Sequence, residues 1–380
     1  MDKQKERVYN KNMNNHLALY RKYRPRTFEE VVGQEHITKT LANQILADKI
    51  SHAYLFTGSR GTGKTSVAKI FAKAVNCENN TTGSPCGECE ACKRLSKEND
   101  INVIEIDAAS NNRVDDIREL REKVKFAPIG ARYKVYIIDE VHMLSDSAFN
   151  ALLKTLEEPP KYVIFILATT EVHKLPATIL SRCSRFDFRL LSIDNLSKVL
   201  RSVFESEGIE AEAEAIKLIA ASGEGSVRDT LSIADSINAY ANGHITKEDV
   251  LKVLGTTDHE LLIKFFDNII NKDIGGVLKQ INQIDASGKN LAIFAKDAAK
   301  HARDLLVCKT CDRPEEILNF PSDVLDKYIA QSERATDKQL IEYMQNFASS
   351  EAELRYALST RLLLESVAIS CINGESAKKN

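Results

Sequence analysis

The chain has 380 residues, of which 28% are charged and 43% apolar, as is usual for a folded protein in water. Its length predicts two or three domains, and its net charge of −2 means that any nucleic-acid contact must come from a local basic patch. No apolar run approaches the roughly 18 residues of a membrane span, and the N-terminus lacks the apolar core of a signal peptide, so we expect a cytoplasmic protein with no membrane partner.

The N-terminal segment is basic. Its first 26 residues carry eight Lys/Arg and two acidic residues. We expect residues 1–16 to form a flexible, solvated extension, and Met1 and Met13 are both candidate starts.

The most informative segment is Gly58–Thr65, which matches the phosphate-loop pattern G-x-x-x-x-G-K-[ST]. Residues 53–57 before it read as a short buried strand, and residues 66–75 after it carry apolar side chains at helical spacing. Such a loop binds phosphate through backbone N–H groups and a helix N-terminus; Lys64 adds a point charge, and the Thr65 hydroxyl can bind Mg²⁺. The alternative is a glycine-rich connector that binds nothing, which the flanking strand and helix disfavour. We expect the chain to bind a nucleoside triphosphate.

A pair of acidic residues, which would be the second part of such a site, follows another expected buried strand. Residues 135–138 form an apolar, β-branched run that ends in Asp139 and Glu140, and ligands of open α/β sheets lie at the carboxyl ends of strands. We expect Asp139 to hold Mg²⁺ and Glu140 to act as general base for the attacking water. A further strand, residues 163–168, leads to Thr170, which is either a contact for the γ-phosphate or water, or a simple strand-end hydroxyl.

Two arginines are candidates to complete this site. Arg182, in the sequence Ser-Arg-Cys, is a candidate arginine finger. Arg228 lies in the first turn of a helix that Ser226 can cap, and would approach the γ-phosphate from a second domain. By periodicity alone, each arginine is more typical of a surface residue.

The eight cysteines of an intracellular chain indicate metal binding or burial rather than disulfides. Four of them lie within sixteen residues, in the pattern Cys77-x8-Cys86-x2-Cys89-x2-Cys92. This spacing suits a closed, tetrahedral structural Zn²⁺ site. An iron–sulfur cluster and reduced free thiols are the alternatives.

The second half of the chain predicts helices and no strands. Amphipathic patterns place a small helical lid at residues 192–242 and an all-helical domain at residues 243–370. Cys308 and Cys311 lie in this helical stretch without a second pair, so burial or chance explains them better than metal. Residues 371–380 are expected to be a disordered tail.

Contact with DNA leaves a weak signal. Residues 108–113 precede an expected helix that carries Arg118, Arg121 and Lys123. Such a helix N-terminus with cations can bind the phosphate backbone without sequence preference. A solvated charged face explains the same pattern equally well.

Taken together, the motifs resemble those of the AAA+ ATPases of clamp loaders and, more narrowly, the gamma/tau subunits of bacterial DNA polymerase III. The resemblance is dense over residues 17–245 and weaker beyond. It rests on the phosphate loop and on residues 19–25, 32–36, 139–144, 150–160, 169–170, 181–183 and 225–229.

The resemblance implies an α/β AAA+ P-loop domain, a parallel sheet flanked by helices, at residues 17–191. A zinc knuckle at residues 77–92 would interrupt it. The helical lid at 192–242 and an all-α collar at 243–370 would follow, and the collar would assemble a five-subunit ring.

The resemblance also implies roles for single residues. Those that would border adenine and ribose are Tyr20, Arg21, Pro25, Val31 and Val32. Those that would hold the phosphates are Gly58, Ser59, Arg60, Gly61, Thr62, Gly63, Lys64, Thr65 and Ser66. Thr170 would be the sensor at the strand tip, Arg228 the sensor from the lid, and Arg182 a finger acting in trans on a neighbouring subunit. Hydrolysis would therefore require oligomerisation.

The implied function is that of an ATP-driven motor subunit of the clamp loader within the DNA polymerase III holoenzyme, loading the sliding clamp on primed DNA during replication. Implied partners are delta- and delta-prime-type subunits, copies of the chain, the clamp, the backbone of primed DNA and the polymerase III core, at replication forks on the nucleoid. A non-hydrolysing scaffold of the same ring and another AAA+ machine, such as a branch-migration helicase, are the alternatives. DNA-directed DNA polymerase (nucleotidyltransferase) activity would belong to the chain only by membership in the holoenzyme, since no polymerase site is visible. Both a short gamma-type product and a truncated tau fit the sequence.

Overall fold

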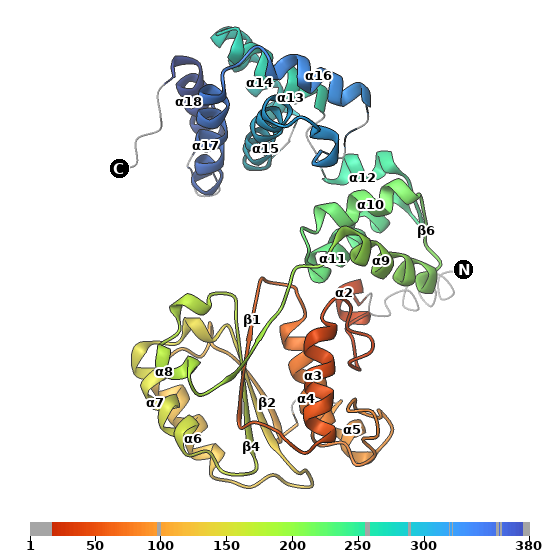
Figure 1. The fold of residues 1–380 in the computed structure, drawn as a ribbon, viewed down its shortest axis with the longest axis vertical. Helices are drawn as coiled ribbons and strands as arrows, with labels where there is room; N and C mark the ends of the chain where they lie inside the picture. Colours follow the sequence, from red (N-terminus) through yellow and green to blue (C-terminus); the bar gives the residue numbers. More distant parts are fainter. Residues whose placement is uncertain are drawn as a thin grey trace, which may run out of the picture. The chain divides into compact units, whose positions relative to one another are not determined.

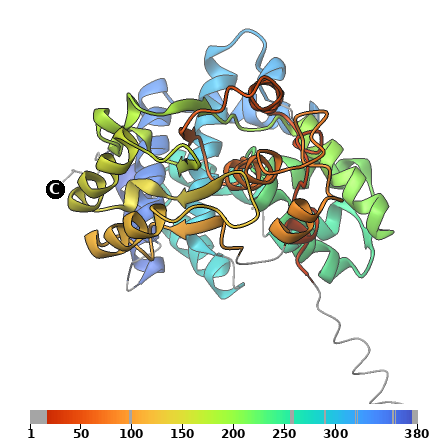
Figure 2. The same ribbon diagram turned by 90° about the horizontal axis from the view of Figure 1, so that it is seen from below.

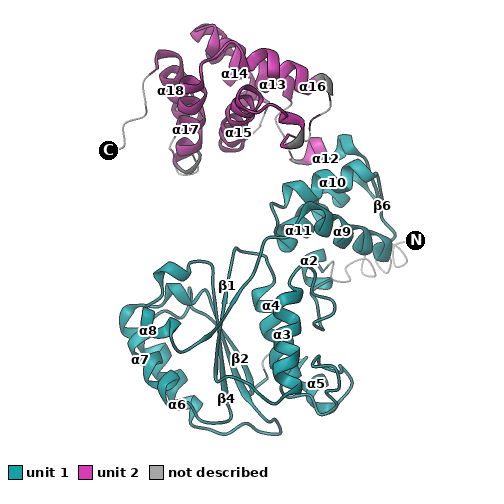
Figure 3. Cartoon of the chain, viewed as in Figure 1, with its two compact units in different colours: residues 1–250 teal, residues 251–380 magenta. Residues whose placement is uncertain are grey.

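The chain forms two compact units, residues 1–250 and residues 251–380 (Figure 3). The predicted extension at residues 1–16 and the last six residues of the predicted tail lie outside the described part. The computed structural model describes residues 17–96, 100–254, 259–287, 290–318, 320, 322–354, 357 and 359–374.

Unit 1 is built on a five-stranded parallel sheet. Its strands lie in the order β2 (Val103–Asp107), β3 (Lys134–Asp139), β4 (Val163–Thr169), β1 (Ala53–Thr57) and β5 (Ser184–Asp187). The three central strands are almost entirely buried, as expected of strands covered on both faces, and they are the strands that the apolar runs predict. The edge strands β2 and β5 mix half-buried and exposed positions, so they do not form the continuous apolar runs that predict the central strands.

Successive residues of each central strand face opposite helical layers. Tyr54 and Phe56 of β1 belong to the core shared with α3 (Glu35–Leu46) and α4 (Lys64–Ala74). Ala53 and Leu55 belong to the core shared with α6 (Val114–Val124), α7 (Asp146–Glu157) and α8 (Ala177–Leu180). Figures 1 and 2 show the two layers on either side of the strands. All strands are parallel, so their carboxyl ends meet at one edge.

Short elements complete this part of unit 1. They are α2 (Leu19–Lys22), α5 (Glu90–Leu95), η1 (Val141–Met143) and η2 (Val172–Lys174).

The rest of unit 1 is the predicted helical lid, with a small addition. Its elements are α9 (Ile193–Glu207), β6 (Glu210–Ala211), α10 (Ala213–Ser222), α11 (Val227–Ala241), β7 (His244–Ile245) and the first half of α12 (Lys247–Leu254), which continues into unit 2. The hydroxyl of Ser192 caps α9, which ends at Gly208 in the left-handed conformation. Strands β6 and β7 form a parallel pair that the sequence pattern did not indicate. The compact unit continues beyond residue 242, to Val250, and thus includes β7.

Within the described part of unit 2, every regular element is helical, as predicted. The elements are α13 (His259–Ile270), α14 (Ile274–Ala286), α15 (Leu291–Thr310), η3 (Pro314–Glu316), α16 (Ser322–Ser332), α17 (Asp337–Leu354) and α18 (Thr360–Asn373). The core combines aliphatic and aromatic side chains, and Phe265, Phe266 and Phe347 are fully buried in it. Cys371 and Ile372 are also buried in this core, so α18 runs three residues into the segment predicted to be disordered. None of the described helices is long and apolar enough to span a bilayer.

Candidate nucleotide site and cysteine cluster

The segment Gly58–Thr65 lies where β1 ends and α4 begins. Its backbone needs glycine, because φ is +140° at Gly58 and +75° at Gly61. A Cβ on Gly61 would also collide with Oγ of Ser226, at the start of α11. The loop is therefore packed directly against the lid.

Lys64 is held inside this loop. It is buried, and its Nζ donates to the carbonyls of Gly58 at 2.8 Å and Ser59 at 2.9 Å. Burial lowers the pKa of Lys64, while the nearby carboxylates of Glu140 and Asp139 favour its charged form. The ammonium group thus has internal acceptors within the segment predicted to bind phosphate.

Thr65 and Asp139 come together at the carboxyl edge of the sheet. Oγ1 of Thr65 donates to Oδ2 of Asp139 at 2.7 Å, and Oδ1 of Asp139 accepts the backbone N–H of Glu140 at 3.0 Å. Hydroxyl and carboxylate oxygens are ligands that Mg²⁺ prefers beside substrate phosphates. The residues present fit that ion.

Glu140 contacts the tip of the neighbouring strand. Its backbone is left-handed, with φ of +46°, which is uncommon for a residue other than glycine. Its Oε2 accepts a hydrogen bond from Oγ1 of Thr170 at 3.2 Å and lies 3.5 Å from Nδ1 of His142. That ring nitrogen is 3.1 Å from Oγ1 of Thr169, and Nε2 is 3.4 Å from Oε1 of Glu171. The predicted base and the predicted sensor are therefore in contact.

Two residues of this site were not predicted from the sequence as single site residues. His142, whose side chain is 7% exposed, ties Glu140 to β4. Gln34 is fully buried; its Nε2 donates to the carbonyls of Arg189 at 2.7 Å and Thr62 at 3.5 Å, which joins the phosphate loop to the segment after β5. The only sequence signal for either was its position inside a motif of the family resemblance.

The N-terminal residues predicted to border the base lie partly against the lid. The guanidinium carbon of Arg228 is 5.2 Å from the ring centroid of Tyr20, and Nε of Arg21 donates to the Tyr20 hydroxyl at 3.1 Å. The hydrogen bond from Arg21 lowers the pKa of Tyr20. The remaining three differ in burial: Val31 is buried, whereas Pro25 and Val32 are half-buried. The structure thus brings Tyr20 and Arg228 together.

Arg182 is directed to other partners. Its guanidinium donates to the carbonyl of Thr178 and to Oε1 of Glu157, both at 2.8 Å. Thr178 lies on α8 and Glu157 on α7. Among the described residues, Arg182 forms no hydrogen bond with the phosphate loop, Asp139 or Glu140. Arg182 is therefore not part of the site that this chain assembles by itself.

The cations suggested for DNA contact lie on α6, where acidic neighbours pair with two of them. Arg118 pairs with Asp115 at 2.9 Å, and Lys123 pairs with Glu119 at 2.7 Å, all on exposed side chains. Such pairs are typical of a solvated helix face.

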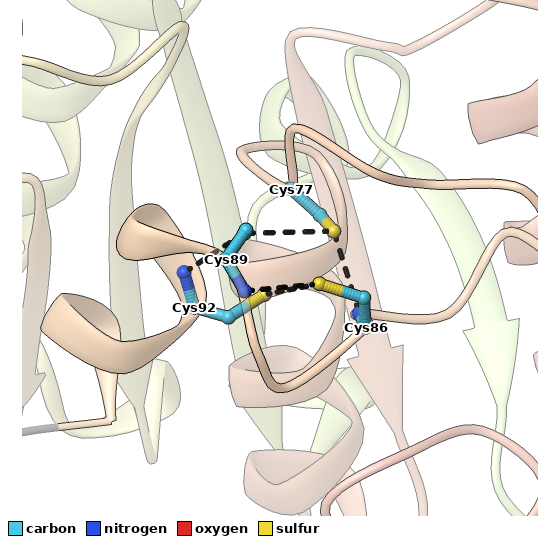
Figure 4. A group of neighbouring side chains, drawn as sticks. All are labelled: Cys77, Cys86, Cys89 and Cys92. Atoms are coloured by element: carbon cyan, nitrogen blue, oxygen red, sulfur yellow. Dashed lines mark hydrogen bonds between the residues drawn. The ribbon is translucent and has the colours of Figure 1, made fainter.

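The four clustered cysteines converge on one point (Figure 4). All four Sγ atoms lie within 4.8 Å of one another, and the pairs Cys77–Cys89 and Cys86–Cys92 are 4.0 Å apart, too far for disulfides. Tetrahedral zinc with Zn–S bonds of about 2.3 Å requires sulfurs about 3.8 Å apart, close to what is seen.

Backbone groups support this cluster. The N–H groups of Cys86, Cys89 and Cys92 donate to the sulfurs of Cys77, Cys86 and Cys89 at 3.3, 3.3 and 3.4 Å. Backbone hydrogen bonds lower the pKa of the Cys86 thiol to about 6. The donor set fits Zn²⁺, and no other cluster of metal-binding side chains occurs in the part of the chain that the structure describes.

Three family profiles cover most of the chain. They are DNA polymerase III, delta subunit, at residues 33–192; DNA polymerase III clamp loader subunit, ATPase lid domain, at residues 195–243; and DNA polymerase III subunits gamma and tau domain III, at residues 245–377. The lid profile ends at residue 243 and the domain III profile begins at residue 245.

Curated relatives agree with these profiles. The chain is 46% identical to DNA polymerase III subunit tau of Bacillus subtilis, over 92% of this chain and 62% of that protein. It is 45% identical to DNA polymerase III subunit tau of Escherichia coli, over 71% of this chain and 42% of that protein. It is 40% identical to DNA polymerase III subunit gamma of Buchnera aphidicola, over 72% and 76%. The chain thus spans about 62% of the length of its first relatives.

Solved structures are more distant. The Thermotoga maritima RuvB Holliday junction branch migration motor aligns with a TM-score of 0.48 at 20% identity, over 65% of this chain and 79% of its own. The Bacillus subtilis DNA clamp loader delta protein aligns with a TM-score of 0.36 at 11% identity, over 88% and 99%. The family is shown by the sequence relatives: this chain belongs to the gamma/tau subunits of bacterial DNA polymerase III.

Proposed function

We propose that this chain is the ATP-driven motor subunit of a bacterial clamp loader and hydrolyses ATP to load a sliding clamp on primed DNA. The observation that carries the proposal is the meeting of Lys64, the Thr65–Asp139 pair and the Glu140–Thr170 pair at one edge of the sheet, in a chain of the gamma/tau family. The clamp-loader lid profile supports the same conclusion. The activity, the substrates and the partners are parts of this proposal, since the chain spans only part of its relatives.

Binding of ATP would exchange internal hydrogen bonds for bonds to phosphate. The backbone N–H groups of Gly58–Thr65 and the N-terminus of α4 would take the β- and γ-phosphates, with Ser66 following in the first turn. Lys64 would give up two neutral carbonyls for charged oxygens, which make stronger hydrogen bonds. Thr65 and Asp139 would hold Mg²⁺, which neutralises charge on the phosphates.

Hydrolysis would use the acid at the end of β3. A water bound next to the Glu140–Thr170 pair would be oriented toward the γ-phosphate, and its proton would pass to the Glu140 carboxylate as the new P–O bond forms. The bond to the β-phosphate oxygen breaks, and ADP leaves with the negative charge. Arg228 would act on the phosphates from the lid.

Arg182 would complete the site of a neighbouring subunit. Its ion pair with Glu157 is half-exposed on both sides, and such pairs contribute at most about 1 kcal/mol. Arg182 can therefore exchange this ion pair for a contact with the γ-phosphate of a neighbouring subunit in an assembled ring. We propose that this ring has five subunits, which are copies of this chain together with delta- and delta-prime-type subunits. The ring would contact the polymerase III core in the cytoplasm.

The cysteine cluster would hold structural Zn²⁺ through Cys77, Cys86, Cys89 and Cys92. Four protein ligands leave no open position on the metal. Its role would be to stabilise the insertion after α4, and polymerase activity would come from other subunits of the holoenzyme.

The first test is the ATPase rate of the chain alone and then with partner subunits, clamp and primed DNA. We expect strong stimulation by the full mixture, and no stimulation would contradict the clamp-loader function. Glu140→Gln should lower the stimulated rate about 10²–10⁴-fold. An unchanged rate would mean that this subunit is a non-hydrolysing scaffold.

The trans role of Arg182 has its own test. In assembled rings, Arg182→Ala should bind ATP nearly normally and lose turnover. Mixing it with Lys64→Ala subunits should restore part of the rate, because the second variant still supplies Arg182 to its neighbour. Arg185→Ala is the matched control, since this arginine is also exposed and paired, with Asp187. Turnover that survives in Arg182→Ala rings would refute the assignment.

A further inference from the structure

A pocket of about 170 Å³ lies between the N-terminal segment and α4. Five of the seven residues that line it are cationic, none is acidic, and the other two are apolar. One water molecule needs only ~10–15 Å³, so the pocket has room for a larger anion. The five cations are Arg21, Arg24, Arg26, Lys69 and Lys73.

Most of this positive charge has no carboxylate partner. Arg24 is half-buried, and its Nε donates to the neutral hydroxyl of Ser66 at 3.0 Å. Lys73, also half-buried, donates to the hydroxyl of Ser96 at 3.1 Å. Among the five cations, Lys69 alone forms an ion pair within the described residues, with the exposed Glu105 of β2. Glu105 and Asp139 also favour the charged form of Arg24, although neither accepts a hydrogen bond from it among the described residues. The pocket is therefore strongly positive.

The cations also repel one another. Burial lowers the pKa of Lys73; a negative charge on Cys92 opposes this shift, and the positive charges of Arg26, Lys69 and Arg24 add to it. A bound anion would relieve this repulsion. Such a site favours ligands with more than one negative charge.

The arrangement suits phosphoryl groups in particular. Lys69 and Lys73 are four residues apart on α4, so they lie on one face and about 6 Å apart along the axis. Arg24 and Arg26 come from the N-terminal segment and line the same pocket. Arginine forks bind phosphate in a bidentate manner, and lysines add point charges.

The pocket adjoins the predicted nucleotide site: Arg21 and Pro25, which line it, are also predicted to border adenine and ribose, and its wall on α4 lies beyond the phosphate loop. Lys69 lies five residues beyond Lys64 on α4, about 7.5 Å farther along the helix axis. The contact of Arg24 with Ser66, next to Thr65, connects the two places.

We propose that this basic pocket is a second anion site, which binds two neighbouring phosphoryl groups of a polyanion other than the nucleotide in the loop. Inorganic pyrophosphate and a single nucleic-acid strand both present such groups. The site does not depend on ATP hydrolysis by the chain, so it can fail or succeed independently of the motor function.

The experiment uses the full chain with its phosphate loop saturated by Mg²⁺ and ADP. Pyrophosphate and a short single-stranded oligonucleotide are titrated separately into wild type, Lys69→Gln/Lys73→Gln and Lys198→Gln/Lys217→Gln. The last variant removes the same charge from exposed positions of the lid. ADP affinity and the thermal melt report whether each variant is folded, and Arg26→Gln, at an exposed position, is a second pocket variant.

We expect the pocket variants to weaken binding of at least one probe about tenfold or more, with ADP affinity unchanged. For the oligonucleotide, two lost phosphate contacts should also reduce the slope of log K against log salt by about 1.4. Binding of pyrophosphate would identify a free phosphate anion, and binding of the oligonucleotide alone would identify a nucleic-acid strand.

Three results would overturn the proposal. The first is that wild type binds neither probe. The second is that the lid control weakens binding as much as the pocket variants do. The third is that excess ADP displaces the probe completely, since the probe would then occupy the phosphate loop.

Discussion

The contact between His142 and Glu140 leads to a quantitative prediction. His142→Ala removes a ring that lies 3.5 Å from Glu140, 3.1 Å from Thr169 and 3.4 Å from Glu171. The side chain is only 7% exposed, so bulk water does not readily take its place. We expect Glu140 to lose its fixed orientation.

The magnitude follows from the number of contacts. Each polar contact of His142 contributes about 0.5–1.5 kcal/mol. Holding Glu140 in the left-handed region costs about 1–3 kcal/mol, and these contacts offset that cost. A loss of about 2 kcal/mol of positioning free energy lowers kcat about 30-fold, at about 1.36 kcal/mol per factor of ten. KM for ATP should stay unchanged, because none of the three contacts involves the phosphate loop.

The assay is the steady-state ATPase rate of assembled rings. His142→Ala should have no further effect in a Glu140→Gln background, since the group that it positions is then gone. His173→Ala is the matched control: it lies 3.6 Å from Glu171 but is 73% exposed, and its ion contact is with that residue. Multiplicative losses in the double variant, or a raised KM, would refute the reasoning.

Three further predictions test other parts of the chain. Thr65→Val removes the hydroxyl bonded to Asp139; because hydrogen bonds to charged groups contribute about 1.5–3 kcal/mol, calorimetry should show at least a tenfold loss of ATP affinity with Mg²⁺ and little loss without it, and equal losses would contradict the role. Chelation of zinc, or Cys86→Ser, should make residues 77–92 sensitive to protease while ATP binding persists, since this cluster packs around its own sulfurs; native reduced protein without zinc would exclude the site. Burial lowers the pKa of His301 to about 4, so its contribution to stability is complete above about pH 6.5 and is lost, by up to about 3 kcal/mol, as the pH falls toward 4. The urea midpoint of wild type should therefore shift more between pH 7 and 4.5 than that of His301→Asn, and equal shifts would argue against the assignment.

The centre of the sheet is predictable from sequence because its physical signal is local. Strands β1, β3 and β4 are buried on both faces, so they read as continuous apolar runs. The phosphate loop and the acidic pair follow such runs directly. The edge strand β5, by contrast, owes its place to pairing with β1, in which Tyr54 lies opposite Ser184. Its own sequence mixes polar and apolar residues.

The supporting residues of the site are unpredictable for a related reason. His142 meets Thr169 across 27 residues of chain, and Gln34 meets Arg189 across 155. No periodicity within one element encodes such pairs. The same holds for Ser226, whose hydroxyl lies so close to Gly61 that any side chain at that glycine would collide with it. Strand register and lid packing decide these contacts, and both arise only in the folded chain.

The internal partners of the reactive groups bear on why a ring would be needed. Lys64 is bonded to two carbonyls of its own loop, Glu140 to a hydroxyl of β4, and Arg182 to a glutamate of α7. Buried polar groups are costly without partners, so the two bonds of the buried Lys64 stabilise the chain as it stands. ATP alone would exchange the bonds of Lys64, because only that group lies in the loop. The exchange at Arg182 requires a phosphate from another subunit, since its present partners lie on α7 and α8. A chain on its own is therefore expected to bind ATP and to hydrolyse it poorly.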